Sequence, residues 1–207
     1  MRHVIGRIGQ SGWMVILVTA TDYLPKQEEW VERITNRIPQ VETIVHNVNS
    51  KRANVILGPT NYVLYGDGTI TDHIKELRFT LSPHSFFQVN PEQTTVLYDQ
   101  ALAYADLKGD ETVIDAYCGT GTISLFLAHK AKHVIGIEIV EPAIINAREN
   151  ARNNGYDNTE FIVADAAIEM PKLYKAGVRP DVIVFDPIRA GCKEEVLTSA
   201  ASMEPNR

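Results

Sequence analysis

The stretch VIDAYCGTGTISL, residues 113–125, decides the fold. It opens with an apolar run of strand length that includes Asp115 near its end. Gly119 and Gly121 mark a tight turn, because a residue without a side chain lets the backbone bend sharply and approach a ligand closely. The following residues, Thr122–His129, are predicted to form a helix. A strand, turn and helix in this order predict an α/β sheet with a ligand site at the carboxyl end of the strand.

The residues around the turn distinguish between two classes of nucleotide ligand. A dinucleotide site favours G-x-G-x-x-G, whereas this turn is G-T-G-T-I-S, and the chain has no G-x-x-x-x-G-K-[ST] phosphate loop. Asp115 before the turn would repel phosphate and suits the cationic, phosphate-free cofactor S-adenosylmethionine. Glu138 ends the next apolar run about 20 positions later, where an acid can bind ribose hydroxyls. The alternative is an ordinary turn with a packing glycine pair.

The second half of the chain alternates strands with helices, which is typical of a parallel sheet with right-handed crossovers. The predicted strands are 112–117, 133–139, 160–165 and 181–186, and the predicted helices are 122–129, 142–154 and 167–176, with one more helix at most in KEEVLTSAASM. Asp165 and Asp186 end the third and fourth strands. Together with Asp115 and Glu138, they predict four acids at one edge of the sheet.

The chain divides into three predicted parts. Residues 1–80 are predicted to form a small α+β domain with a mostly antiparallel sheet. Its predicted elements are a strand pair within 1–20, a helix over 27–37, and strands in VETIVHNVNS (41–50), NVILG (54–58) and YVLYG (62–66). Residues 81–110 are a connecting segment with a helix from Pro91 to about Ala105, capped by Asn90. Residues 111–207 are the Rossmann-like core; its sheet is expected to be incomplete, because DVIVFD is apolar enough for a central strand.

Composition predicts a globular cytoplasmic protein without a membrane partner. The 207 residues are 44% hydrophobic and 22% charged, with no apolar run of membrane-span length and no signal peptide. Cys118 and Cys192 have neither metal spacing nor a disulfide framework, and His46 and His73 are expected to be packed or surface residues, so no metal is predicted. Residues 1–90 carry nine basic and eight acidic residues, and the remainder 11 and 18. Such an acidic half is not typical of a self-sufficient nucleic-acid binder.

Six motifs carry a resemblance to a known family. They are NVNSKRANVILG (47–58), SFFQVNPEQ (85–93), DAYCGTGTISL (115–125), GIEIVEPAI (136–144), ADA (164–166) and DPIRAGC (186–192). In this combination the chain resembles the RNA (uracil-5-)-methyltransferases of the ribosomal-RNA type over nearly its whole length. The resemblance implies a Rossmann-like, S-adenosylmethionine-dependent transferase of RNA that methylates carbon 5 of uridine and takes part in ribosomal-RNA processing.

The resemblance also implies roles for individual residues. By motif, the cofactor would be surrounded by Gln88, Tyr117, Glu138, Asp165 and Asp186, with Thr122 at a further position of the cofactor loop, beside the Asp115 and Gly119 of the turn itself. Local spacing alone favours a hydrophobic staple for Phe86 and Phe87, whereas the resemblance places one of them against the target base, which would leave its stack to reach the pocket. Arg189 is the third candidate for substrate binding.

The chemistry that the resemblance implies needs residues that these motifs do not contain. Carbon 5 of uracil is a poor nucleophile, so a cysteine thiolate adds at carbon 6 and a general base later removes the carbon 5 proton. In the family both groups lie downstream of DPxRxGC, and neither Cys118 nor Cys192 matches the nucleophile. We assign no catalytic residue. We expect a fragment without the N-terminal RNA-binding domain and the C-terminal catalytic segment, which binds cofactor but is inactive alone.

Two other functions are weighed against this one. An amino-group methyltransferase of protein or nucleic acid would place an aromatic residue where Arg189 stands. A non-catalytic binding or scaffolding piece with a vestigial pocket agrees with the missing nucleophile, but the intact set Gln88, Glu138 and Asp186 argues against it. Ile188 stands where the family has a second proline, and we expect it to loosen the loop after the fourth strand.

Overall fold

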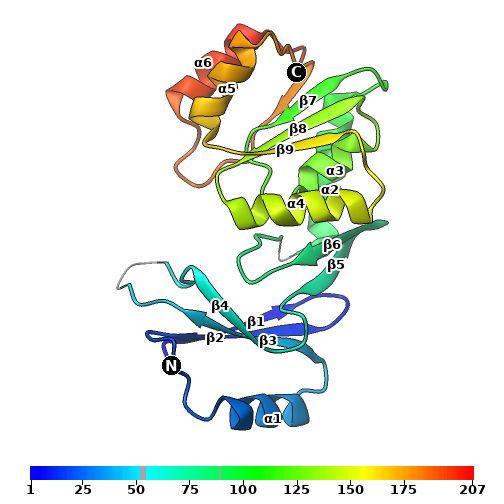
Figure 1. The fold of residues 1–207 in the computed structure, drawn as a ribbon. Coiled ribbons are helices and arrows are strands. Elements are labelled where there is room, and N and C mark those ends of the chain that lie inside the picture. Colours follow the sequence, from blue (N-terminus) through cyan, green and yellow to red (C-terminus); the bar gives the residue numbers. More distant parts are fainter. Residues whose placement is uncertain (52–54, 89) are drawn as a thin grey trace. The chain divides into compact units, whose positions relative to one another are not determined.

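The computed structural model describes residues 1–51, 55–88 and 90–207. The chain forms two compact units, one made of residues 1–73 and 80–84, and one made of residues 74–79 and 85–207. Each unit contains its own four-stranded sheet (Figure 1). No helix of the described residues is both long and apolar enough to cross a membrane.

The first unit is built on a mixed sheet in the order β1-β2-β3-β4. Its strands are β1 (His3–Ile8), β2 (Trp13–Thr19), β3 (Val41–Val48) and β4 (Thr60–Tyr65), and its helix is α1 (Gln27–Arg37). The β1–β2 and β3–β4 pairs are antiparallel, whereas β2 and β3 pair in parallel with α1 as the crossover between them. Two of the three pairings therefore have the direction that the sequence predicted.

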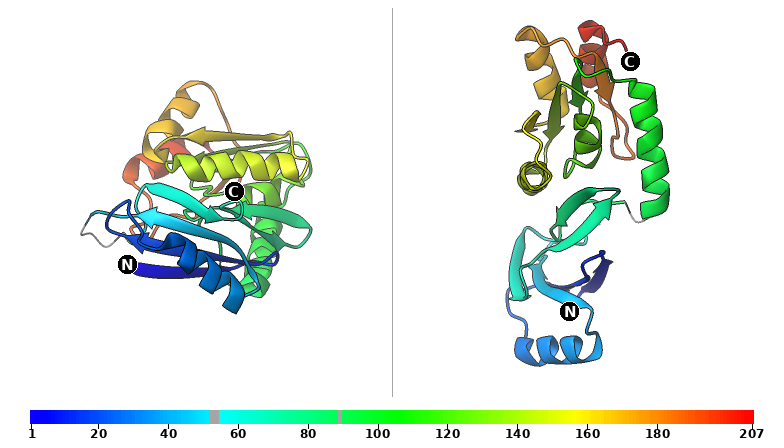
Figure 2. Two further views of the ribbon diagram at one scale, coloured as in Figure 1. Left: turned by 60° about the horizontal axis from the view of Figure 1, so that its bottom comes forward. Right: turned by 90° about the vertical axis from the view of Figure 1, so that its right-hand side faces the viewer.

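Helix α1 covers one face of this sheet, as the right-hand view of Figure 2 shows. Val31 and Ile34 of the helix pack against buried strand residues such as Leu17 and Ile44. Trp30, the third apolar residue at helical spacing, is 43% exposed. The partial burial of Val31 and Ile34 holds the helix on the sheet, because tertiary packing stabilises a helix of this length more than its propensity does.

The predicted strand NVILG is wrong for residues 55–58, which form no strand; Asn54 lies outside the described residues. Asparagine side chains from β3 and the residue after it bind the backbone of this segment. Asn49 Nδ2 donates to the carbonyls of Val55 and Ile56, and Asn47 both donates to the Gly58 carbonyl and accepts from its N–H at 2.7 Å. These bonds satisfy backbone groups that a strand would pair with a neighbour.

A hairpin and a helix lead to the core of the second unit. Strands β5 (Ile70–Ile74) and β6 (Leu77–Leu81) form a two-stranded sheet, and α2 spans Pro91–Ala105. The predicted cap of α2 is confirmed, because the Asn90 side chain accepts a hydrogen bond from Gln93 N at 3.1 Å.

The second unit has a parallel sheet in the order β10-β7-β8-β9, which confirms the α/β class. Its strands are β7 (Thr112–Asp115), β8 (His133–Glu138), β9 (Thr159–Val163) and β10 (Val182–Val184). Its helices are α3 (Thr122–Ala128), α4 (Glu141–Asn153), α5 (Ala166–Lys175) and α6 (Glu194–Met203). The chain leaves β7 toward β8 and returns to β10 on the other side, so the strand order reverses at β7. Ligands of open α/β sheets bind at the strand ends beside such a reversal.

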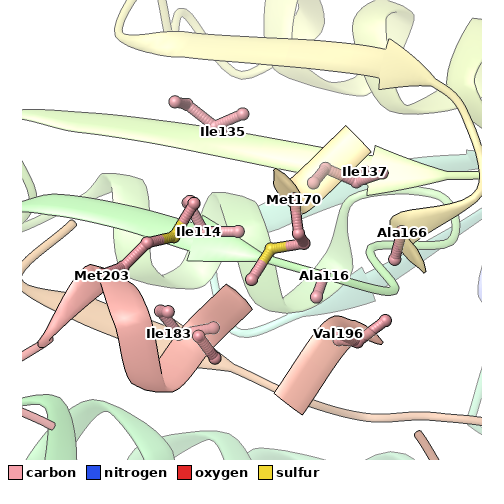
Figure 3. Packing of buried hydrophobic residues seen from close by; sticks show 10 residues of the cluster. Ile114, Ala116, Ile135, Ile137, Ala166, Met170, Ile183, Val196 and Met203 are labelled. Atoms are coloured by element: carbon pink, nitrogen blue, oxygen red, sulfur yellow. The ribbon is translucent and has the colours of Figure 1, made fainter. Parts of the chain in front are cut away.

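Alternate residues of these strands pack into two separate cores, as strands buried on both faces require. Ile114, Ile135 and Ile183 face α5 and α6, where they meet Met170 and Met203 (Figure 3). Their neighbours Val113, Val134 and Val182 form the other core, together with Ala105 of α2 and Leu127 of α3. The two layers of helices hold the sheet, and thus the strand ends that carry the site.

The outer edge of β10 is bordered by the backbone of Arg207. Arg207 N donates to the carbonyl of Asp181, and its own carbonyl accepts from Ile183 N at 3.0 Å. These two bonds have the pattern of a parallel bridge. The Arg207 guanidinium also pairs with Asp106 at 2.9 Å. The edge of β10, expected to be uncovered, is thus partly occupied in the structure.

Candidate active site

The glycine turn has the conformation that the sequence required. Gly119 and Gly121 have φ values of 54° and 81°, in the left-handed region that favours glycine. A Cβ on Gly121 would also lie 3.1 Å from the ring of Phe161 and 3.2 Å from Ala147 Cβ. Strand β7, this turn and helix α3 therefore pack closely against β9 and α4.

Glu138, at the end of β8, is held by the backbone on both sides. Its Oε2 accepts a hydrogen bond from Gly119 N at 3.2 Å, and its Oε1 accepts one from Val140 N at 2.9 Å. Each carboxylate oxygen can accept about two hydrogen bonds, so both oxygens keep capacity for a ligand. The two carboxylate oxygens of Glu138 are thus oriented hydrogen-bond acceptors beside the glycine turn.

A pocket of about 800 Å³ opens at the carboxyl ends of the strands of the second unit. Ten of the residues predicted to bind cofactor or substrate line it: Phe86, Phe87, Gln88, Tyr117, Gly119, Thr122, Glu138, Asp165, Asp186 and Arg189. They come from the segment before α2 and from the ends of all four strands. Residues far apart in the sequence are therefore brought together at one site.

Asp115 differs from the expectation, because it does not line this pocket. Its side chain is fully buried, and its Oδ2 accepts a hydrogen bond from Ser124 Oγ of α3 at 2.7 Å. Its Oδ1 has no hydrogen-bond partner among the described residues. Burial raises the pKa of this carboxyl group to about 6, and the nearby charges of Asp186 and Glu138 act in the same direction.

This buried carboxyl group predicts a pH dependence of stability. The folded state holds the Asp115 proton more tightly than the unfolded state, so stability is lost as the pH rises from about 4 to about 6. We expect Asp115→Asn to remove about 1–3 kcal/mol of this decline. Urea unfolding at several pH values measures it, with Asp157→Asn at an exposed position as the control. Equal slopes for wild type and Asp115→Asn would contradict the prediction.

Asp165 does not end β9 as predicted but caps helix α5, two residues further on. Its Oδ1 accepts from Ala167 N at 2.9 Å and its Oδ2 from Lys193 Nζ at 2.6 Å. The hydrogen bond from Lys193 is the main reason that the pKa of Asp165 is lowered. This ion pair connects the segment after β10 to the start of α5, and both partners line the pocket.

Several side chains of the segment after β10 are exposed although they line the pocket. Asp186 and Arg189 are exposed, and Ile188 is 77% exposed, while the Ile188 carbonyl accepts from Gly191 N at 2.8 Å and closes a turn. Gly191 has a φ of 78°. The loosening of this segment by Ile188 stays a prediction.

The two phenylalanines before α2 have different surroundings. Phe87 packs its ring against Phe79 of β6, with the ring centroids 5.7 Å apart. This contact joins it to a strand, whereas a hydrophobic staple would join it to α2. Phe86 is 69% exposed and lines the pocket. Phe86 is therefore the better placed of the two to stack on a ligand.

Among the pocket residues that sequence reasoning missed are Tyr98 and Lys193. Tyr98 shares the buried face of α2 with Thr94, four residues earlier, and this spacing indicates burial but names no neighbour. Lys193 follows the DPIRAGC motif, and its partner lies 28 residues earlier in the sequence. No local signal marks either contact.

The other titratable residues that the sequence singled out, His46, Cys118 and Cys192, lie against neighbouring residues of the fold. Burial is the main cause of the lowered pKa of His46, whose Nε2 lies 2.6 Å from Thr19 Oγ1. Cys118 is buried under the turn, and burial raises the pKa of its thiol. Cys192 lines the pocket beside Tyr117, whose pKa rises to about 12 through burial and a hydrogen bond with Cys192. Among the described residues no group of three metal-binding side chains occurs.

Comparisons with known proteins agree with this geometry. Residues 107–205 match the family model described as "Methyltransferase domain". An "Uncharacterized RNA methyltransferase" of Halalkalibacterium halodurans is 54% identical, over 100% of this chain and 46% of that protein. One of Bacillus cereus is 51% identical over the same shares. The chain spans about half the length of the curated relatives it matches.

Solved structures share the fold. The tRNA (uracil-54, C5)-methyltransferase of Pyrococcus abyssi, in complex with S-adenosyl-L-homocysteine, has a TM-score of 0.75 and 24% identity, over 98% of this chain and 47% of that one. The tRNA m1G37 methyltransferase of M. jannaschii has a TM-score of 0.57 and 15% identity, over 96% and 55%. The second unit therefore has the Rossmann-like fold of S-adenosylmethionine-dependent methyltransferases, and this fold with the domain match supports S-adenosylmethionine as the cofactor.

Proposed function

We propose that this chain is the cofactor-binding part of an RNA methyltransferase that transfers a methyl group from S-adenosylmethionine to carbon 5 of uridine. The observation that carries the proposal is the shared pocket, in which an oriented Glu138 and the carboxylate of Asp186 meet an exposed aromatic ring, Phe86. Acidic groups attract the cationic cofactor, and the ring offers a surface for a base.

The strand order predicts how the cofactor lies in this pocket. The sheet places the end of β9 at one side, β8 and β7 in the middle, and β10 at the other. If Glu138 at the end of β8 accepts from the ribose hydroxyls, the adenine lies toward Asp165. The methionine part then lies over β7 and β10, near Thr122 and Asp186. The side chains of the pocket fit the cofactor, because the cofactor's ammonium and sulfonium groups are positively charged and the pocket contains carboxylates.

The methyl transfer itself needs a nucleophile and a base, and we assign neither role to a residue of the pocket. The cofactor supplies an electrophilic methyl group, while activation of carbon 5 requires a thiolate nucleophile. The raised pKa of Cys118 is the opposite of what a nucleophilic thiol needs, and the residue is buried. In the family that the chain resembles, the nucleophile and base lie downstream of DPxRxGC. We therefore propose that the chain alone binds cofactor without turnover.

RNA is the proposed substrate, and ribosomal RNA is the class to test first. The relatives that match the whole chain are named RNA methyltransferases, and the P. abyssi enzyme is named for uracil-54 of tRNA. The sequence motifs resemble the ribosomal-RNA type, so ribosomal RNA and tRNA become two arms of one experiment. A cytoplasmic location stays a prediction from the sequence.

Nucleoside analysis tests the proposed reaction. A chain extended beyond Arg207 with the sequence that follows it in the natural protein is incubated with methyl-labelled S-adenosylmethionine and unmodified ribosomal RNA or tRNA. We expect labelled 5-methyluridine from one of the two RNAs. A label on an amino group of protein or nucleic acid would support the amino-group methyltransferase. Cofactor binding without any labelled product would favour a vestigial pocket.

Phe86 provides a second test, of the substrate side. In the chain extended beyond Arg207, we expect Phe86→Ala to lower kcat/KM for RNA about tenfold, because stacking of a base on an aromatic ring contributes about 1–3 kcal/mol. The Kd for S-adenosylmethionine should stay within about twofold. Tyr104→Ala is the matched control, since Tyr104 is 72% exposed on α2 and outside the pocket lining. Equal effects of both substitutions on kcat/KM would contradict a role of Phe86 in stacking.

A further inference from the structure

We propose that Tyr98 is a positioning residue, which aims one hydroxyl hydrogen of the Tyr98–Thr122 pair at the carboxylate of the cofactor's methionine part. This inference rests on the proposed function only in taking S-adenosylmethionine as the ligand of the pocket. It gives helix α2, which precedes the Rossmann-like core, a direct role in binding the cofactor.

The pair is formed by residues of two different helices. Tyr98 belongs to α2 and is 2% exposed, whereas Thr122 is the first residue of α3, directly after the glycine turn. The Tyr98 Oη and Thr122 Oγ1 atoms are 3.0 Å apart, and both residues line the pocket. The contact therefore joins α2 to the first residue of α3, directly after the glycine turn.

The hydrogen-bond count of the pair leaves one donor unused. Each hydroxyl has one hydrogen, and only one of the two is needed for the bond between Tyr98 and Thr122, whichever residue donates it. Neither hydroxyl has another hydrogen bond within residues 1–51, 55–88 and 90–207 of the structure. The pair as a unit therefore presents one O–H donor at the pocket.

The charges around the pair indicate which ligand group takes this donor. Burial raises the pKa of Tyr98, and the charges of Asp186 and Asp115 raise it further, so the phenol stays protonated and neutral. Acids on this side of the pocket favour the cofactor's ammonium and sulfonium groups and repel its carboxylate. A neutral hydroxyl donor can bind the carboxylate without adding repulsion. By the strand order, the methionine part lies over β7, where Thr122 follows the turn.

The ring of Tyr98 is fixed by its neighbours. It meets Phe126 edge-on, with the centroids 5.7 Å apart and an interplanar angle of 65°. Lys75 Nζ lies 5.3 Å from the centre of the Phe126 ring and also pairs with Asp99, the residue after Tyr98. The edge-on contact with Phe126 and the burial of the ring keep the Tyr98 hydroxyl in one place, which is what a positioning residue requires.

Two ligands that differ in the methionine part test the inference. S-adenosylhomocysteine carries the amino acid end, whereas 5′-methylthioadenosine lacks it and shares the rest. We expect Tyr98→Phe to lower the affinity for S-adenosylhomocysteine about tenfold and to leave that for 5′-methylthioadenosine within about twofold. Thr122→Val should behave alike, and the double variant should bind no more weakly than either single variant, because the two hydroxyls act as one unit. Tyr104→Phe on the exposed side of α2 is the control.

The other possible results of this binding experiment lead to different conclusions. Equal loss for both ligands would show that Tyr98 only supports the fold of the pocket, and the inference would be overturned. Unchanged affinity of Tyr98→Phe for S-adenosylhomocysteine, or losses that add in the double variant, would also overturn it. A wild-type chain that is folded and binds neither ligand would instead contradict the proposed function.

Discussion

Alanine in place of Glu138 is expected to weaken S-adenosylmethionine binding about 100-fold. Both carboxylate oxygens are oriented by backbone N–H groups of Gly119 and Val140 and keep capacity for the ribose hydroxyls. Loss of two hydrogen bonds to a charged acceptor corresponds to about 3 kcal/mol, which is about 100-fold in Kd. Isothermal titration calorimetry of wild type and Glu138→Ala measures this difference.

A matched control separates the ribose contact from general effects of charge. Glu160→Ala removes an exposed glutamate near the start of β9, whereas the pocket lies at the carboxyl ends of the strands. This substitution should leave the Kd for S-adenosylmethionine within about twofold. A 3′-deoxy analogue of the cofactor tests the contact itself, because it should lose affinity with the wild type but lose little more with Glu138→Ala. Wild-type affinity in the Glu138→Ala variant would remove Glu138 from the site.

Valine in place of Gly136 is expected to destabilise the second unit by about 3 kcal/mol. Gly136 lies within β8, and an added Cβ would lie 2.6 Å from Phe161 Cδ1 and 2.9 Å from Cys118 Sγ. Both neighbours are buried, so the side chains cannot move aside without displacing β9 or the glycine turn. Overpacking of this kind typically costs about 1–3 kcal/mol, and a branched side chain lies at the upper end. The midpoint of urea unfolding, followed by circular dichroism, should fall accordingly.

Gly6→Val is the control for this substitution. Gly6 also lies in a strand, β1, but an added Cβ there would meet no atom within 4 Å. The same chemical change should therefore leave the unfolding midpoint nearly unchanged. If the two variants unfold at the same urea concentration, close packing beneath the glycine turn is not what Gly136 provides.

The sequence predicted the parts of the fold that depend on local pattern. Apolar runs bounded by glycine or acid gave the four strands of the core, and the paired glycines gave the turn, because both signals act over a few residues. The cap of α2 by Asn90 belongs to the same class. Neighbouring strands in a parallel sheet present their ends at one edge, so the grouping of Glu138, Asp165 and Asp186 also followed from the pattern. The aromatic residues, Gln88, Thr122 and Arg189 were implied by the family resemblance instead.

The errors concern hydrogen-bond partners of polar side chains, which an apolar pattern does not name. Asp115 was expected in the pocket but accepts a hydrogen bond from Ser124. The direction of a side chain at a strand end depends on how it packs. The NVILG strand failed because Asn47 and Asn49 bind its backbone, which a β-favouring composition does not reveal. Asp165 precedes a helix start, and its N-cap role could have been predicted from that position.

A calorimetric titration decides whether the pocket of the second unit binds S-adenosylmethionine. The 207-residue chain, first shown by circular dichroism to be folded, is titrated with S-adenosylmethionine in a calorimeter. We predict saturable binding of one cofactor per chain, because the pocket and its oriented acceptor Glu138 lie within the second unit. A folded chain that releases no heat of binding and shows no competition by S-adenosylhomocysteine would contradict the assignment of this pocket to the cofactor.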